Sequence, residues 1–252
     1  MATIEEPLSG GNATAEVVRV DSTVRKPWRT STPSVHRFMA HLREQGLPDV
    51  PEPLGRDADG RQVMEFISGC SVPLDRPLSD PVLRDVGRIV RQIHDASASF
   101  TLGEEDSWNT VIPVEHADLV CHNDLAPWNL IIGRNMAFID WDGAGPSTRL
   151  WDLAYAAQSF AFLVDGQEPK AAAARLRAVV IDGYHADAPL LVGLSAAMVA
   201  RTQAMYDLLA DSYRDGIQPW GSMFVEGHGE HWAKAARFVK DHETLWDQCL
   251  NA

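Results

Sequence analysis

The N-terminal part of the chain carries short apolar runs that are typical of strands, with one helical pattern between them. Ala15–Val20 and Thr23–Lys26 are β-prone runs separated by two polar residues, which predicts a hairpin. Val63–Ile67 predicts a further strand. Between them, apolar residues at helical spacing precede a glycine stop at Gly46: Val35, Phe38, Met39 and Leu42. We therefore expect a small sheet with one helix.

Beyond Gly69 the pattern changes to a helical one. A proline-rich segment, Val72–Pro81, leads into the stretch "DPVLRDVGRIVRQIHDAS", whose apolar residues recur every three or four positions. Further stretches predict helices: Ala171–Tyr184, Pro189–Tyr213 and His228–Leu250. The change in pattern indicates two parts, residues 1–68 and 69–252.

Between these helical patterns lies one segment of a different kind, Leu119 to Pro146. Its apolar runs, Leu130–Ile132 and Met136–Ile139, are separated only by "GRN", which predicts a second hairpin. That hairpin brings Asn129 and Asp140 to the same end, and Asp124 lies in the loop before it. Magnesium prefers such oxygen ligands. A phosphoryl-transfer site needs these ligands together with a carboxylate that accepts a proton from the attacking hydroxyl.

The same residues resemble a known family. The segment "HNDLAPWN", His122 to Asn129, is similar to the HxDxxxxN catalytic loop of the aminoglycoside phosphotransferases and choline kinases, which are relatives of protein kinases. "IDWD" resembles their metal-binding segment, and "WDLA" their following D-L-A segment. The resemblance implies that Asp124 is the catalytic base and that Asn129 and Asp140 bind magnesium. His122, Asp142 and Asp152 would be supporting residues.

The resemblance extends towards the N-terminus. "LSGGNAT" is similar to the loop that covers the ATP phosphates, with Gly10 and Gly11 letting the backbone approach an anion. Arg25 and Lys26 both occupy the position of the phosphate-binding basic residue, and they face opposite sides of a strand. We favour Arg25, because Thr23-Val24-Arg25 resembles the A-x-K order of kinases. Backbone groups near Glu65 and Ile67 would meet adenine.

These similarities imply a protein-kinase-like α+β fold with a small antiparallel-sheet N-lobe, residues 1–68, and a mainly helical C-lobe, residues 69–252. The implied activity is ATP- and magnesium-dependent transfer of a phosphoryl group to a hydroxyl of a small molecule, with aminoglycosides and other antibiotics among the candidate acceptors. One feature departs from the family: the first helix lacks an early glutamate to pair with the phosphate-binding lysine, and its only glutamate is Glu44.

Two alternatives stay open. One is a nucleotide-binding immunity or regulatory protein that keeps the fold but catalyses nothing, which the missing helix glutamate favours. The other is a metal-dependent phosphatase or nuclease that uses the same carboxylates. The glycine loop and the three filled positions Asp124, Asn129 and Asp140 favour the kinase.

The amino-acid composition limits the classes of partner that the protein is expected to bind. The chain has 35 acidic and 22 basic residues, a net charge of -13, which argues against nucleic-acid binding and is compatible with a cationic small molecule. Its three cysteines show no metal or disulfide spacing, which fits a reducing cytoplasm. Neither an export signal nor an apolar run long enough to span a membrane is found, so no membrane contact is expected. The two lobes can complete a site within one chain, as a monomer or in a homodimer.

Overall fold

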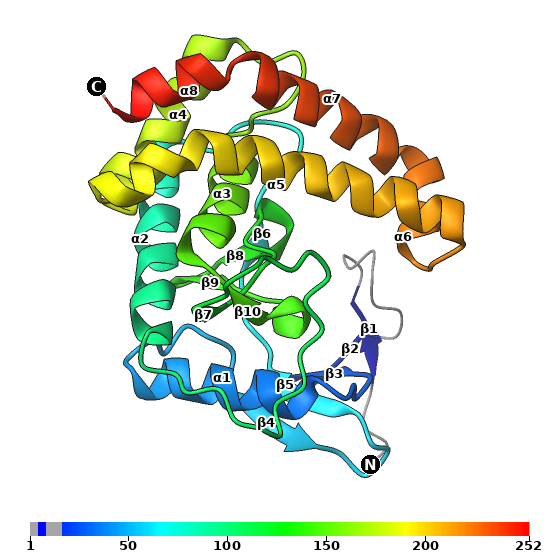
Figure 1. Ribbon diagram of the computed structural model, residues 1–252. Helices are drawn as coiled ribbons and strands as arrows, with labels where there is room; N and C mark the ends of the chain where they lie inside the picture. The colour runs from blue at the N-terminus through cyan, green and yellow to red at the C-terminus, as the bar shows by residue number, and fades with distance from the viewer. Residues whose placement is uncertain (1–4, 9–16, 252) are drawn as a thin grey trace.

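The computed structural model describes residues 5–8 and 17–251 (Figure 1). Its N-terminal part is a five-stranded antiparallel sheet with strand order β1-β2-β3-β5-β4. The strands are β1 (Glu6–Pro7), β2 (Val18–Val20), β3 (Thr23–Lys26), β4 (Pro53–Arg56) and β5 (Gln62–Glu65). Helix α1 (Thr32–Glu44) follows β3 and packs against β4 and helix α2. The first predicted hairpin is therefore present as β2 and β3.

Helix α1 forms where the apolar spacing predicts it. Pro33 lies in its first turn, where a missing N–H costs nothing, and Gly46 follows its end with φ +93°. The four apolar residues of the pattern are all buried: Val35, Phe38, Met39 and Leu42. These residues share one core cluster with residues of the C-terminal part, which fixes α1 to the rest of the molecule.

The centre of the molecule carries the second predicted hairpin. β8 (Leu130–Ile132) and β9 (Met136–Phe138) pair antiparallel, and β6 (Cys70–Ser71) joins them on the free edge of β8. A separate pair, β7 (Leu119–Cys121) and β10 (Gly145–Ser147), flanks the same loop. Two single helical turns, η1 (Pro127–Asn129) and η2 (Trp141–Gly143), carry the polar residues between these strands.

The remainder of the chain is helical: α2 (Asp80–Ser97), α3 (Arg149–Phe160), α4 (Pro169–Arg177), η3 (Ala178–Gly183), α5 (Ala188–Asp215), α6 (Trp220–Met223), η4 (Phe224–His228), α7 (Gly229–Asp241) and α8 (Glu243–Leu250). Figure 1 shows the long helix α5 between α3 on one side and α7 and α8 on the other. The antiparallel sheet followed by a mainly helical part confirms the predicted kinase-like fold class. In the ranges 5–8 and 17–251, no helix combines the length and the apolar character needed to cross a membrane.

Three helix predictions need correction. The stretch Ala171–Tyr184 is helix α4 followed by the wider turn η3, because the chain must bring Gly183 against α2. The stretch His228–Leu250 is two helices, since the chain leaves helical geometry at His242, whose φ is -113°. Helix α3 was not predicted, because it is buried on most of its surface and lacks an amphipathic pattern.

The contact between α2 and η3 depends on a glycine. A Cβ atom at Gly87 would lie 2.1 Å from the Val179 carbonyl oxygen, which is backbone and cannot move away cheaply. We expect Gly87→Ala to destabilise the protein by about 3 kcal/mol, because α2 and η3 would have to separate. Gly193→Ala in helix α5 is the matched control, since its Cβ would meet only the flexible Leu150 side chain and helix propensity favours alanine. Thermal unfolding measures the stability of both variants. Equal losses of stability would contradict the close contact between α2 and η3.

Candidate functional site

Asp124 lies in the loop after β7, held by the turn that follows it. The Asn129 side-chain amide donates to the Asp124 Oδ2 atom at 2.8 Å and to the Asp124 carbonyl oxygen at 2.9 Å. The Trp128 indole N–H approaches the same carboxylate oxygen at 3.4 Å. The turn η1 brings all three residues together, because its backbone folds Asn129 back towards Asp124. The predicted base and the predicted metal ligand are therefore neighbours.

The surroundings of Asp124 shift the pKa of its carboxyl above the ordinary value. Burial, the largest influence, raises the pKa of its carboxyl, although His122 and the hydrogen bond from Asn129 oppose that rise. Burial raises the pKa of the Tyr155 phenol well above the ordinary value, and the nearby Asp124 carboxylate adds to that rise. Tyr155 therefore stays a neutral donor. A carboxylate with a raised pKa is a better proton acceptor than an ordinary aspartate.

Asp140 and Asp142 lie opposite Asp124 and bind the side chain of Lys26. Asp140 follows β9 with left-handed backbone angles, φ 60° and ψ 58°, a conformation that is rare outside glycine and frequent at functional sites. The Lys26 ammonium forms an ion pair with Asp140 and lies 3.1 Å from the Asp142 Oδ2 atom. Burial alone would lower the pKa of Lys26, but the two carboxylates outweigh it and raise that pKa. Lys26 in turn lowers the pKa of Asp140.

The structure places Lys26, and not the favoured Arg25, beside Asp140 and Asp142. Arg25 points to the other face of the sheet, where its guanidinium lies 3.4 Å from Asp57 and donates to Thr23 Oγ1 at 2.5 Å. The two residues alternate as expected of a strand. The face turned towards Asp140 and Asp142 is the one that Lys26 shares with Val24. The geometry therefore favours Lys26 over Arg25 as the basic residue at this position.

A neutral chain of hydrogen bonds connects α1 to this site in place of the missing glutamate. The Gln62 side-chain amide donates to Asp142 Oδ1 at 3.3 Å, and its carbonyl oxygen lies 3.3 Å from His36 Nε2. Burial lowers the pKa of His36, so the imidazole is neutral near pH 7. Helix α1 thus contacts the carboxylate side of the ion pair instead of pairing with Lys26 directly. The apolar pattern of β5 gave no sign of a role for Gln62.

Asp152 and His122 support the loop that carries Asp124. Asp152, on α3, accepts the Asn123 backbone N–H at 2.8 Å, and its other oxygen lies 2.9 Å from His94 Nε2. His94 in turn lies 2.9 Å from the Tyr184 hydroxyl. The His122 ring lies 3.1 Å from the Ile139 carbonyl oxygen and packs on a buried tryptophan. These buried hydrogen bonds hold the loop between α2 and α3.

We expect Asp152→Ala to impair both stability and turnover. The substitution leaves the Asn123 N–H and one His94 nitrogen buried without partners, which costs about 3 kcal/mol. Because Asn123 directly precedes Asp124, we also expect kcat to fall at least tenfold while the KM for ATP changes little. Asp152→Asn, which still accepts one hydrogen bond, should lose less of both. Wild-type kcat in folded Asp152→Ala would refute this role.

Only some of the predicted nucleotide-binding residues lie within the described residues. Gly10 and Gly11 lie outside the described residues. The Glu65 side chain lies 3.4 Å from Arg43, and its backbone N–H donates to the Glu52 carbonyl. That N–H is therefore not available to adenine. The Ile67 N–H has no hydrogen-bond partner in residues 5–8 and 17–251. It is therefore available to adenine.

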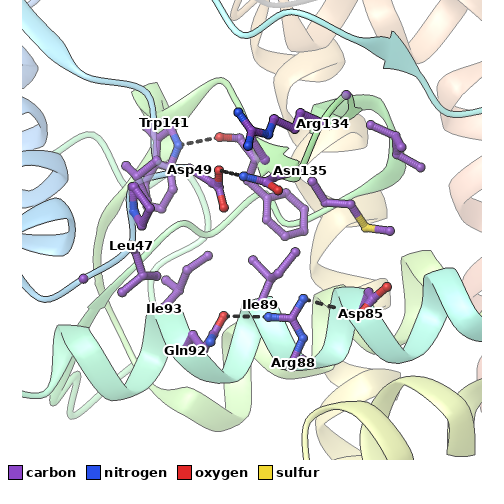
Figure 2. Close-up of a pocket in the computed structure, with 18 residues that line it drawn as sticks. Leu47, Asp49, Asp85, Arg88, Ile89, Gln92, Ile93, Arg134, Asn135 and Trp141 are labelled. Atoms are coloured by element: carbon purple, nitrogen blue, oxygen red, sulfur yellow. Dashed lines mark hydrogen bonds and ion pairs between the residues drawn. The ribbon is translucent and has the colours of Figure 1, made fainter.

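A cavity of about 1110 Å³ joins Asp124, Asn129, Asp140 and Asp142 to the C-terminal helices. Arg201 of α5 also lines it, which sequence reasoning missed because no motif surrounds that residue. A second cavity, of about 460 Å³, lies between the loop after α1, helix α2 and the β8–β9 turn (Figure 2). None of the predicted site residues lines this second cavity. The site therefore opens towards the C-terminal helices.

Residues 103–190 match the model of the phosphotransferase enzyme family. A trifolitoxin immunity protein of Rhizobium leguminosarum bv. trifolii is 32% identical over 167 residues, which cover 63% of this chain and 62% of that protein. The chain thus matches less than two thirds of that relative's length.

Solved structures share the fold at low sequence identity. An amicoumacin kinase in complex with AMP-PNP, Ca²⁺ and Ami is 14% identical, with a TM-score of 0.63 over 92% of this chain and 86% of that chain. A choline/ethanolamine kinase family protein from Mesorhizobium loti is 15% identical, with a TM-score of 0.59 over 99% and 92% of the two chains. These matches agree with the resemblance of "HNDLAPWN", "IDWD" and "WDLA": residues 103–190 are similar to the phosphotransferase enzyme family, and the chain shares the kinase-like fold of the solved structures.

Proposed function

We propose that the protein is an ATP- and magnesium-dependent phosphotransferase that acts on a hydroxyl of a small molecule, with Asp124 as the base. One observation carries the proposal. Asp124, hydrogen-bonded to Asn129, lines the large cavity together with Asp140 and Asp142, and both of these carboxylates pair with the buried Lys26 ammonium. Proton acceptor, metal ligands and a phosphate-binding cation are the groups that phosphoryl transfer needs.

The donor set fits magnesium. Asn129 uses its amide nitrogen on Asp124, which leaves its amide oxygen for a cation, and the carboxylates of Asp140 and Asp142 add further oxygens. When bound, magnesium would neutralise charge on the transferred phosphoryl group. Lys26, displaced from its two carboxylates, would bind the phosphates, to which the Gly10 and Gly11 backbone would also donate, and Ile67 would meet adenine. The nucleotide would lie between the lobes, residues 1–68 and 69–252, of a cytoplasmic enzyme.

A non-catalytic immunity protein on the same fold is the second candidate. The ion pairs of Lys26 with both Asp140 and Asp142 favour it, because in that arrangement the cation occupies the metal ligands. The similarity to a trifolitoxin immunity protein supports a protective role for either candidate. Antibiotics, aminoglycosides included, are therefore acceptors to test, beside choline and amino alcohols.

Magnesium-dependent ATP turnover separates the two candidates. The purified protein would be screened against aminoglycosides, peptide antibiotics, choline and amino sugars, with nucleotide binding measured by calorimetry in parallel. Turnover that requires both magnesium and an acceptor, and that disappears in Asp124→Ala, supports the enzyme. ATP binding without turnover on any acceptor supports the immunity protein, and failure to bind ATP contradicts both.

A further inference from the structure

Arg201 is a buried cation with an unused donor next to the base loop. Its side chain leaves helix α5 and is 5% exposed, and its guanidinium lies 4.2 Å from the centre of the Tyr155 ring. One terminal nitrogen, Nη2, donates to the Asn123 carbonyl oxygen at 3.3 Å. The other, Nη1, is buried without a hydrogen-bond partner in the described part of the chain. Arginine stays charged, so this donor is costly to leave unpaired.

Arg201 lines the cavity in which the phosphoryl acceptor would bind. Arg201 lines the same cavity as Asp124, and the carbonyl that it contacts belongs to Asn123, the residue directly before Asp124. The guanidinium lies over the Tyr155 ring, and Tyr155 also lines the cavity that holds Asp124. Arg201 and Asp124 therefore line one cavity, and Arg201 contacts the loop that carries Asp124.

Much of the remaining wall of the cavity is apolar or aromatic. Its side chains come from η1, α5, α6 and α7 and include Trp128, Met205, Leu208, Trp220, Met223 and Trp232. Outside the three aspartates of the base and metal positions, the lining has one carboxylate, Glu226, against three arginines. A polycationic acceptor would meet few opposite charges on this wall.

We propose that Arg201 binds a carbonyl or carboxylate oxygen adjacent to the reacting hydroxyl, and that the acceptor is an amphiphilic molecule with an aromatic or aliphatic portion rather than a polycation. The inference rests on the proposed phosphotransferase function. The oxygen satisfies Nη1, and the apolar portion lies against the tryptophans of the wall. Arg201 is in this sense a specificity residue that positions the hydroxyl at Asp124.

Two probes that differ by one group test the proposal. N-acetyl-phenylalanyl-serinamide carries a carboxamide beside its hydroxymethyl group, and N-acetyl-phenylalanyl-ethanolamine lacks it. With ADP and magnesium present, calorimetry should give at least tenfold tighter binding of the serinamide to the wild type, as expected for a hydrogen bond to a charged donor. Arg201→Gln should reduce that preference to about twofold, with Arg201→Lys between them. An aminoglycoside should bind more weakly than the serinamide.

Equal binding of the two probes to the wild type, or binding of neither, overturns the proposal. So does a preference that survives in Arg201→Gln. If Arg201 only held the Asn123 loop, its substitution would weaken both probes equally, so the ratio separates the two roles even where the melting temperature falls. If Arg201→Gln does not fold, the comparison of the two probes on the wild type still tests the proposal. Magnesium-dependent ATP binding and turnover are measured separately, so failure of this inference leaves the proposed function to its own test.

Discussion

Asp124→Asn should abolish phosphoryl transfer and at the same time stabilise the protein. Loss of a general base costs about 10²–10⁴-fold in rate, and asparagine cannot accept the proton. The Asn129 amide can still donate to the side-chain oxygen at position 124, so the loop keeps its geometry. ATP binding should therefore change little, as it should in Asp124→Ala.

The expected gain in stability follows from the raised pKa of Asp124. A carboxyl whose pKa is higher in the folded state binds its proton more tightly there, so its ionised form opposes folding above that pKa. Removing the charge relieves this cost near pH 7, so we expect Asp124→Asn to have a higher Tm than the wild type. Below the pKa the difference should vanish. Scanning calorimetry at pH 7 and at acidic pH measures it.

The same raised pKa predicts the pH dependence of catalysis. The base must be ionised, so kcat/KM falls as pH falls through the pKa of the free enzyme. The acidic limb should therefore lie above 3.8, the ordinary value for aspartate. A limb at or below 3.8, or wild-type turnover in Asp124→Asn, would remove Asp124 from the base position.

Lys26→Met should cause the second large effect. The Lys26 side chain is 6% exposed, and its removal leaves Asp140 and Asp142 facing each other without a cation. Breaking such a pair costs about 3–5 kcal/mol when both partners are fully buried. Asp140 is 31% exposed, so we expect about 2–3 kcal/mol here. Turnover should fall by about 10²–10³, because a charge that stabilises the transferring phosphoryl group is lost.

Arg25→Met is the matched control for Lys26→Met. Asp57, the partner of Arg25, keeps its second ion pair with Arg61 at 2.9 Å, so we expect less than about 1 kcal/mol. Magnesium should raise the Tm of Lys26→Met more than that of the wild type, since the metal replaces the missing cation. A larger loss of turnover in Arg25→Met than in Lys26→Met would reverse the assignment made from the geometry.

Local patterns in the sequence predicted the elements that carry the site. The hairpin β8–β9 followed from two apolar runs with a three-residue turn, and its register brings Asn129 and Asp140 to the same end. The motif "HNDLAPWN" identified Asp124, because its functional residues lie at a fixed spacing within one short segment. Helix α1 followed from its apolar spacing.

What the sequence did not reveal depends on contacts between distant segments. Lys26 and Asp140 are separated by 114 positions, and strand alternation alone leaves either face of β3 open to the site. Arg201 contacts Asn123 across 78 positions and belongs to a long helix with no motif of its own. Helix α3 escaped prediction because a helix buried on most sides has no polar face to mark its period.

The ion pairs of Lys26 have a practical meaning for handling the protein. Many metalloproteins unfold when a chelator strips the ion that holds their ligands together. Here the ammonium already neutralises the two carboxylates, so EDTA should leave the fold intact and activity should return on dialysis into magnesium. Because the Lys26 ammonium serves as the counter-ion of Asp140 and Asp142, the chain can reach its native state before it binds any nucleotide.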